Sequence, residues 1–305
     1  MSFDKVHFCG DYNFLGLPDE DTAYEDAKAV IIPVPYDSTT SYRSGTREGP
    51  SAIIMASRQM ELFDLDLQCE PLNTGVHTLT ELQPDMRGPA ETIENIENAV
   101  RSVVEDGKMP VILGGEHSIT TAPIKVLKEK YGNELSVLQL DAHSDLREAY
   151  EQTPYSHASV MRRVFDFARI TQVGIRNTCK SEMDFIKKVG HDGIFWAHDI
   201  CTGDDSWMDK VLQRLSDKVY ITIDLDAFDP SIMPAVGTPE PGGMLWYQSL
   251  KLLNRVIDEK TLVGFDVVEL CPIAGNISSD FLAAKLVFKM LGRVFKKNGW
   301  VVDNA

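Results

Sequence analysis

Short runs of apolar residues recur along the chain, each four to seven residues long. They lie at 29–34, 110–113, 135–140, 169–174, 219–223 and 262–268. Because their apolar character is nearly continuous rather than alternating, they predict strands that are covered on both faces. Residues 90–106 and 279–296 instead place apolar residues at helical spacing. Strands that alternate with helices predict an α/β fold, with a mostly parallel β-sheet and helices on both faces.

The composition of the chain limits the cellular compartment and the binding partners that we expect for the protein. The 305 residues contain no internal repeat or Gly/Ser linker, so we expect residues 1–305 to form a single domain. A net charge of −16 argues against nucleic acid or an anionic membrane as the main partner and attracts cations. The sequence shows no signal-peptide pattern, no apolar run near the roughly 20 residues of a membrane span, and no CxxC pair. These features predict a cytoplasmic protein with free thiols.

Polar residues gather where the predicted strands end. In parallel sheets, ligands bind in the crevice beyond the carboxyl ends of the strands. Four strands lead into carboxylates and imidazoles: Glu116 and His117 in GGEHS; Asp141, His143 and Asp145 in DAHSD; Asp224, Asp226 and Asp229 in DLDAFDP; Asp266 and Glu269 in DVVEL. We expect the fold to bring these side chains to one rim. Gly114 and Gly115 would give the first segment the backbone freedom of a tight turn.

This many acids at one rim would repel one another, or take up protons, unless a cation neutralised them. The candidate ligands comprise four carboxylates and two imidazoles: His117, Asp141, His143, Asp145, Asp224 and Asp226. That set is too large for one tetrahedral zinc and suits two metal ions that share bridging carboxylates. Oxygen-rich ligation favours a hard divalent ion, and manganese fits best, with zinc, cobalt and nickel still open. A metal pair that activates water predicts hydrolysis.

These segments also carry a resemblance. GGEHS, LQLDAHSD and TIDLDAFDPSIMPAVGTPEPGG resemble the three motifs of the ureohydrolase family, which includes arginases and agmatinases, in the same order. VPYDSTTSYRSGTREGPSAI, QVGIR and DVVEL are similar to that family too, so the resemblance covers about the whole chain. It implies an arginase-like α/β/α sandwich, two Mn(II) ions per chain and urea as a product. It also implies a homo-oligomer, a trimer or a hexamer.

The resemblance assigns roles by motif. His117, Asp141, Asp145 and Asp224 match the ligands of one manganese, and Asp141, His143, Asp224 and Asp226 match those of the other. Glu269 matches the carboxylate that pairs with the substrate guanidinium. Asp145 also matches the residue that steadies the tetrahedral intermediate, and His157 in YSHAS matches a proton-shuttling histidine, a task that suits the pKa of an imidazole. The predicted mechanism is attack of a metal-bridging hydroxide on the guanidino carbon, with Asp145 and His157 protonating the departing amine.

The substrate is read from the loop LREAYEQTPYSHAS. Its acidic residues Glu148 and Glu151 suit a distal cation, which favours agmatine, a small cationic guanidino compound that yields putrescine and urea. N1-aminopropylagmatine is a longer alternative. Arg147 in the same loop could bind a carboxylate, so guanidinobutyrate and arginine stay open. A single-zinc deacetylase-like amidohydrolase and a non-catalytic relative are alternatives of other classes, and metal stoichiometry would separate them.

Several of these residues also have purely structural interpretations. Glu269 could be a buried partner of Arg176, and His157 an ordinary core histidine. Asp229, which precedes a proline, suits a turn, and Glu116 suits a supporting position beside the ligands. The remaining histidines sit in no matched motif and are expected to be structural: His7, His77, His191 and His198.

Overall fold

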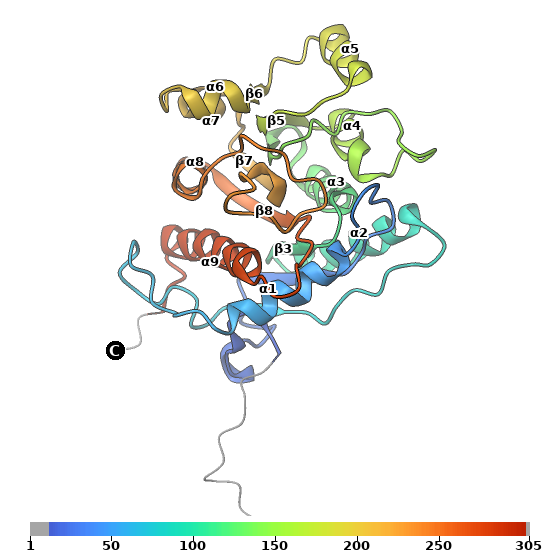
Figure 1. Cartoon of the computed structure of the whole chain (residues 1–305). Coiled ribbons are helices and arrows are strands. Elements are labelled where there is room, and N and C mark those ends of the chain that lie inside the picture. Colours follow the sequence, from blue (N-terminus) through green and yellow to red (C-terminus); the bar gives the residue numbers. More distant parts are fainter. Residues whose placement is uncertain (1–11, 303–305) are drawn as a thin grey trace, which may run out of the picture.

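The computed structural model of the chain describes residues 12–302. Its strands are β1 (Ala29–Val34), β2 (Val76–Thr78), β3 (Met109–Gly114), β4 (Leu135–Leu140), β5 (Arg169–Ile175), β6 (Ile194–Trp196), β7 (Lys218–Asp224) and β8 (Thr261–Val268). They form one eight-stranded sheet in the order β2-β1-β3-β8-β7-β4-β5-β6, and the paired strands run parallel (Figure 1). The predicted α/β class is confirmed.

Helices cover both faces of this sheet (Figure 1). One face carries α1 (Gly49–Ser57), α6 (Ala197–Thr202), α7 (Trp207–Arg214), α8 (Trp246–Glu259) and α9 (Ser278–Asn298). The other carries α2 (Pro89–Glu105), α3 (Thr121–Tyr131), α4 (Val160–Phe165) and α5 (Lys180–Val189). Because successive strand residues point to opposite faces, Ile31 packs in one hydrophobic cluster and its neighbour Ile32 in the other.

The apolar runs predicted six strands and two helices within about two residues of their observed ends. The edge strands β2 and β6 were not predicted, because each has only three residues and both are largely half-buried. A run of that length does not stand out from the apolar positions of a loop. The unpredicted strands extend the sheet at its two edges, whereas the four central strands β3, β8, β7 and β4 were all predicted.

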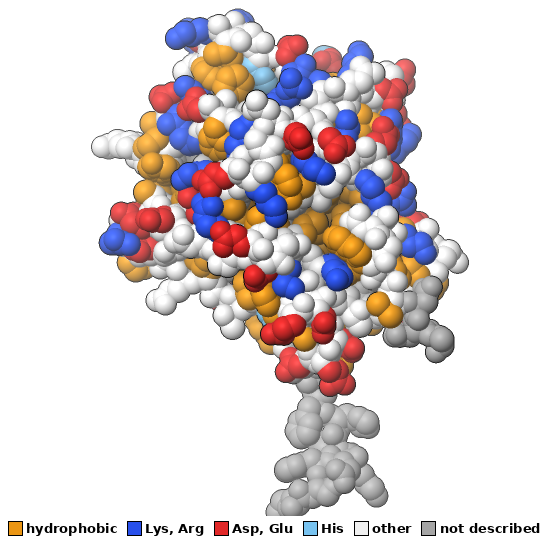
Figure 2. All heavy atoms as spheres, turned by 180° about the vertical axis from the view of Figure 1, so that it is seen from behind, with side chains coloured by type: hydrophobic (Ala, Val, Ile, Leu, Met, Phe, Trp, Pro, Cys, Tyr) orange, Lys and Arg blue, Asp and Glu red, His pale blue; other side chains and the backbone are white. Residues whose placement is uncertain are grey.

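The surface mixes both signs of charge. On the face drawn in Figure 2, acidic and basic side chains are interspersed, and acidic residues gather at its lower end. Cys69, Cys179, Cys201 and Cys271 are free thiols, while His7 and Cys9 lie outside the described residues. Within residues 12–302, no helix combines the length and the apolar character needed to cross a bilayer.

Candidate metal centre and active site

The candidate ligands and Glu269 come from the ends of the four central strands. His117 opens a short 3-10 turn just after β3, and Asp141 directly follows β4. Asp224 is the last residue of β7, and Glu269 directly follows β8. Since parallel neighbours end at the same edge, these four segments meet although they are far apart in the sequence. The expectation of one shared rim is therefore met for these residues.

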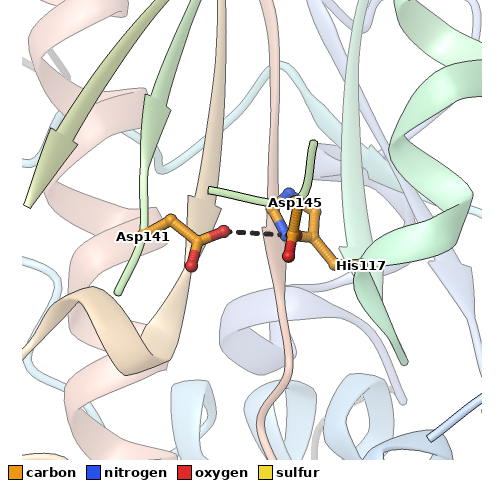
Figure 3. Close-up of side chains that lie close together, drawn as sticks. All are labelled: His117, Asp141 and Asp145. Carbon is orange, nitrogen blue, oxygen red and sulfur yellow. Dashed lines mark ion pairs between the residues drawn. The ribbon is translucent and has the colours of Figure 1, made fainter. Parts of the chain in front are cut away.

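His117 is the centre of the first group of ligands. Its Nδ1 atom lies 3.1 Å from Asp141 Oδ2, 3.2 Å from Asp145 Oδ2 and 3.3 Å from Asp224 Oδ2. Figure 3 shows the Asp141 carboxylate directed at the ring of His117, which Asp145 overlaps in this view. The nitrogen is buried and has no partner in hydrogen-bond geometry. A ring nitrogen facing three carboxylate oxygens, none of them well aligned for a proton, is an arrangement that fits a cation.

His143 forms a second group with Asp226 and Asp141. His143 Nδ1 lies 2.9 Å from Asp226 Oδ2 and 3.7 Å from Asp141 Oδ1. Asp141 thus presents one oxygen to each histidine, which is the position of a ligand shared by two ions. The ligand atoms of His117, Asp141 and Asp145 lie within 4.8 Å of one another, and so do those of Asp141, His143 and Asp226. The structure brings all six predicted ligands together.

Hydrogen bonds orient the second group. The carboxylate of Asp226 accepts from the backbone N–H of Ala142 at 3.0 Å, and that of Asp224 accepts from the N–H of Asp226 at 2.9 Å. The N–H of His143 donates to Asp141 Oδ1 at 2.5 Å. These backbone donors fix the rotation of each carboxylate before any ligand arrives.

Two site residues adopt left-handed backbone conformations. The φ angles are 51° for Asp145 and 67° for Glu269, values that residues other than glycine rarely adopt. Surrounding contacts hold both: Asp145 O accepts from Arg162 N at 3.0 Å, and Glu269 N donates to Gly115 O at 2.8 Å. Strain of this kind concentrates at functional sites because the rest of the fold must compensate for it.

Gly115 is needed for a close approach rather than for backbone freedom. Neither Gly114 nor Gly115 has a positive φ, so the tight-turn interpretation does not explain these glycines by a left-handed backbone. An added Cβ at Gly115 would lie 1.8 Å from Tyr36 O, a distance that no pair of non-bonded atoms tolerates. The backbone N–H of Glu116 donates to that same oxygen at 2.8 Å. The absent side chain therefore lets the segment after β1 pack against the segment that carries His117.

Asp266 supports His117 and does not reach the cavity. His117 Nε2 lies 2.9 Å from Thr222 Oγ1, and the Thr222 hydroxyl donates to Asp266 Oδ1 at 2.6 Å. Tyr220 donates to the other carboxylate oxygen at 2.7 Å. The prediction that Asp266 faces the rim is corrected: it lies inside β8 and is fully buried beneath the ligands.

A line of side-chain amides supports Asp141. Gln139 Nε2 donates to Asp141 Oδ2 at 2.6 Å, and Gln172 Nε2 donates to Gln139 Oε1 at 2.5 Å. Gln172 Oε1 lies 3.1 Å from His191 Nε2. Gln139 and Gln172 are register partners on β4 and β5, and both are fully buried. Since each amide must donate toward Asp141, the outermost oxygen must accept, which makes His191 the donor.

Burial sets the protonation of the acids when no cation is present. Burial and the charge of Asp141 raise the pKa of Asp145 to about 7. Burial and the charge of Glu116 raise the pKa of Glu269 to about 8. For His117, burial alone would lower the pKa, but its contacts with the carboxylates raise it well above the ordinary value. Without a cation, protons thus offset part of the negative charge of the site.

One cavity of about 210 Å³ connects the predicted catalytic residues. All the candidate ligands except Asp141 line it, together with Glu269 and His157. Glu269 accepts from the N–H of His117 at 2.7 Å, while Arg176 donates to backbone oxygens of Asp226 and Glu240. The alternative pairing of Glu269 with Arg176 is therefore not what the structure contains.

The mouth of the cavity differs from the prediction. Glu148 and Glu151 are not among the lining residues, and Glu148 is exposed and pairs with Arg162 at 3.1 Å and Arg163 at 3.0 Å. Arg147 does line the cavity, with its guanidinium 4.6 Å above the Tyr150 ring centroid.

Sequence reasoning missed other residues of the mouth, among them Tyr42, Tyr150 and Glu182. Glu182 belongs to α5, where its carboxylate caps the helix by accepting from Cys179 N at 2.8 Å. Arg147 Nε approaches the same carboxylate at 3.9 Å. A capping glutamate carries no signal that it also borders a site. Asp229 forms a turn, as predicted, by accepting from Ser231, Gly242 and Gly243.

Comparison with known proteins identifies the family. The family model described as "Arginase family" matches residues 27–292. The chain belongs to the arginase family. The predicted resemblance to arginases and agmatinases is thereby confirmed, and the eight-stranded parallel sheet with helices on both faces is the arginase-like fold.

This arginase-family member is similar to the following three proteins. It is 38% identical over 278 residues to N(1)-aminopropylagmatine ureohydrolase of Synechocystis sp., covering 89% of this chain and 90% of that protein. It is 34% identical to agmatinase of Pyrococcus horikoshii, covering 88% and 92%. The crystal structure of agmatine ureohydrolase of Thermoplasma volcanium matches with a TM-score of 0.83 at 32% identity, covering 96% of this chain and 97% of that one.

Proposed function

We propose that this arginase-family member is a binuclear metal ureohydrolase that cleaves the guanidino group of an agmatine-type amine and releases urea. The observation that carries the proposal is the meeting of two His/Asp groups and the Glu269 carboxylate at one narrow cavity. Two divalent ions, with manganese as the proposed metal, would be held by His117, Asp141, His143, Asp145, Asp224 and Asp226. When bound, such ions act as Lewis acids that bring the pKa of water toward neutrality.

Glu269 orients the substrate in this proposal. Its Oε1 atom is fixed by the N–H of His117, and its Oε2 atom points toward Gly237, which also lines the cavity. A guanidinium presents several N–H donors, so a fixed carboxylate binds it through charge-assisted hydrogen bonds and aims its carbon. The carbon is a poor electrophile because its charge is delocalised, and alignment therefore matters for the rate.

Asp145 and His157 handle the proton. The departing amine must be protonated as the C–N bond breaks, and both side chains line the cavity. Burial lowers the pKa of His157 to about 4, so the imidazole is neutral at the start and takes up a proton before it gives one away. Asp145, which lines the same cavity, is the second proposed carrier.

The substrate we favour carries a distal amine rather than a carboxylate. Arg147, the residue that would bind a carboxylate, is engaged with Tyr150 and lies near Glu182. The sequence favoured agmatine, but the more similar of the two relatives is named for N1-aminopropylagmatine, so we place that compound first and agmatine second. Glu148 adds little support, because arginines already pair with it.

The test is urea release by manganese-loaded protein from N1-aminopropylagmatine, agmatine, guanidinobutyrate and arginine. Asp224→Asn serves as the inactive variant, and Asp184→Asn, an exposed aspartate on α5, as the matched control. We expect turnover of the two amines by wild type and Asp184→Asn alone. Preferred turnover of guanidinobutyrate would mean that Arg147 leaves Tyr150 to bind the acid. No urea from any compound, with one metal per chain, would favour the deacetylase-like alternative.

A further inference from the structure

We propose that Thr39 is a positioning residue that selects the tautomer of His157. Its hydroxyl makes Nδ1 of His157 the proton donor and leaves Nε2 as a hydrogen-bond acceptor toward the cavity. Thr39 lies in the segment that follows β1, far in sequence from His157, and no sequence motif connected the two. The catalytic consequence of this arrangement rests on the proposed function, whereas the tautomer itself does not.

The Thr39 hydroxyl has three neighbours and one proton. Its oxygen lies 2.7 Å from Glu116 Oε1, 3.0 Å from the backbone nitrogen of His157 and 3.3 Å from His157 Nδ1. The backbone N–H can only donate, so it uses one lone pair of the hydroxyl. The proton goes to Glu116, the nearest acceptor and a carboxylate. Only a lone pair then faces His157 Nδ1, so that nitrogen must carry the hydrogen.

Glu116 is held as an acceptor by its surroundings. Its side chain is fully buried, and Oε2 accepts from the backbone N–H of Thr39 at 2.6 Å. The hydroxyl of Ser118 donates to Oε1, the same oxygen that receives the Thr39 hydroxyl. One backbone donor and two hydroxyls therefore converge on this carboxylate. The Glu116 that follows the two glycines sets the direction of the Thr39 hydroxyl, which in turn sets the ring of His157.

The arrangement gives His157 one available nitrogen. The ring lines the cavity, and its orientation is also fixed by the edge of Tyr150, with ring centroids 5.8 Å apart and planes at 86°. With Nδ1 occupied by Thr39, Nε2 is the nitrogen left for a ligand. A lone pair there accepts an N–H from a guanidinium or an ammonium and repels a carboxylate oxygen. The site thus selects cationic N–H donors at this point.

The same lone pair defines the proton transfers. Nε2 can accept a proton from the attacking water, which forms the imidazolium while the C–O bond forms. It then returns that proton to the amine nitrogen as the C–N bond breaks, so the ring is neutral again at the end. A ring with hydrogen on Nε2 could not take the first proton, as in enzymes where a histidine is fixed in the wrong tautomer.

The tautomer can be measured directly. Full-length protein labelled with ¹⁵N-histidine and loaded with Zn(II), which is diamagnetic, is studied by NMR through the long-range couplings of the ring protons. His157→Gln identifies the signals of His157. We expect the Nδ1–H form in wild type and in Thr39→Ser, and a mixture in Thr39→Val. Glu116→Gln should invert it, because the amide can donate to the Thr39 hydroxyl and turn the hydroxyl proton toward Nδ1.

Kinetics provide a second readout. Thr39→Val should lower kcat by about 10- to 100-fold, the range for side chains that orient a reactive group, with KM changed far less. Thr39→Ser should restore kcat, and Thr202→Val, an exposed threonine of α6, should match wild type. An Nε2–H ring in wild type, or a wild-type tautomer in Thr39→Val, would overturn the proposal. If no guanidino compound is hydrolysed, the proposed function fails while the NMR result still decides the tautomer.

Discussion

Asp141 is the residue on which both groups of candidate ligands depend. It presents Oδ2 to His117 and Oδ1 to His143, and its Oδ2 also accepts from Gln139. An asparagine at this position cannot reproduce that pattern, because an amide nitrogen would face another donor on one side or the other. Both carboxylate oxygens of Asp141 are therefore needed, and asparagine cannot replace it without the loss of a contact.

We predict that Asp141→Asn removes at least one metal ion per chain and lowers urea release by at least about 100-fold. The loss of one charge leaves two histidines and three other carboxylates without their shared partner. Metal content by elemental analysis after gel filtration measures the first effect and a urea assay the second. Two metals in the variant, with activity intact, would contradict the assignment of a shared ligand. Asp184→Asn serves again as the control.

A substitution at Glu269 tests the binding of the substrate guanidinium. Glu269→Gln can keep the hydrogen bond from the N–H of His117 through its amide oxygen but loses the charge. We expect kcat/KM to fall by about 10- to 100-fold, since a hydrogen bond to a charged group contributes about 1.5 to 3 kcal/mol. Steady-state kinetics with the preferred substrate measures it. Glu259→Gln, near the exposed end of α8, should change nothing.

The sequence shows some residues of the site and hides others for a physical reason. His117, Asp141 and Asp224 stand at the ends of apolar strands, so strand pattern and chemistry point to them together. Thr39 and Glu182 come from loops or helix caps, and only tertiary packing puts them near the cavity. Thr39 stands in the family-like segment VPYDSTTSYRSGTREGPSAI, but nothing in that segment connects it with His157, and Glu182 looks like an ordinary cap residue.

At the scale of elements, the pairing of β4 with β5 supports the metal site. The register places Gln139 opposite Gln172, and both amides are fully buried and aligned toward Asp141. Gln172 Nε2 also donates to Ser144 O at 2.8 Å, which ties the strand to the loop after β4. A one-residue slip of β5 along β4 would turn Gln172 to the face opposite Gln139 and break this line of amides. The register between β4 and β5 therefore also sets the orientation of the Asp141 carboxylate.

We predict that Gln172→Leu weakens metal binding by about tenfold, because Gln139 loses the donor that fixes its orientation. The unfolding free energy should also fall by about 1 to 3 kcal/mol, since Gln139 Oε1 and Ser144 O are left without that partner. Metal titration and chemical denaturation measure the two effects. Thr171→Val is the matched control, because that neighbouring hydroxyl is buried and has no hydrogen-bond partner. Equal metal affinity in both variants would contradict the prediction.

At the scale of the whole molecule, the fold was more predictable than the mouth of the cavity. Continuous apolar strands fixed the sheet core, because burial on both faces requires it. Glu148 does not line the cavity as predicted, because it pairs with two arginines of α4. A sequence pattern does not show that pairing. The trimer or hexamer stays a prediction that light scattering can measure.

The charge of the site predicts how metal and pH act on the stability of the molecule. The pKa of Asp145 rises from 3.8 to about 7 on folding, and that of Glu269 from 4.5 to about 8. At these two groups the folded metal-free protein holds protons that the unfolded chain releases, so their contribution to stability is lost as the pH rises from about 4 to 8. Divalent ions replace those protons, so their binding strengthens over the same range.

The expected result is a larger difference in Tm between metal-loaded and chelator-treated protein at pH 8 than at pH 5. His157 and His191, whose pKa values fall to about 4 on burial, destabilise both forms below about pH 6.5 and so contribute little to the difference. Thermal unfolding at both pH values, at constant ionic strength, measures the effect. A difference that is the same at both pH values would show that protons and metal do not compete.

The placement of the candidate ligands and Glu269 at the ends of β3, β8, β7 and β4 has a consequence for how this chain can vary. These strands form the middle of the sheet, where a change in one disturbs two neighbours. Arg147 and Tyr150 instead lie between Asp145 and His157, on the connection that runs from the end of β4 to α4. An insertion or exchange between Asp145 and His157 leaves every strand, every candidate ligand and His157 itself in place. The residues that border the cavity can therefore be exchanged between relatives, with a change in substrate selectivity, while the strands and the candidate ligands stay unchanged.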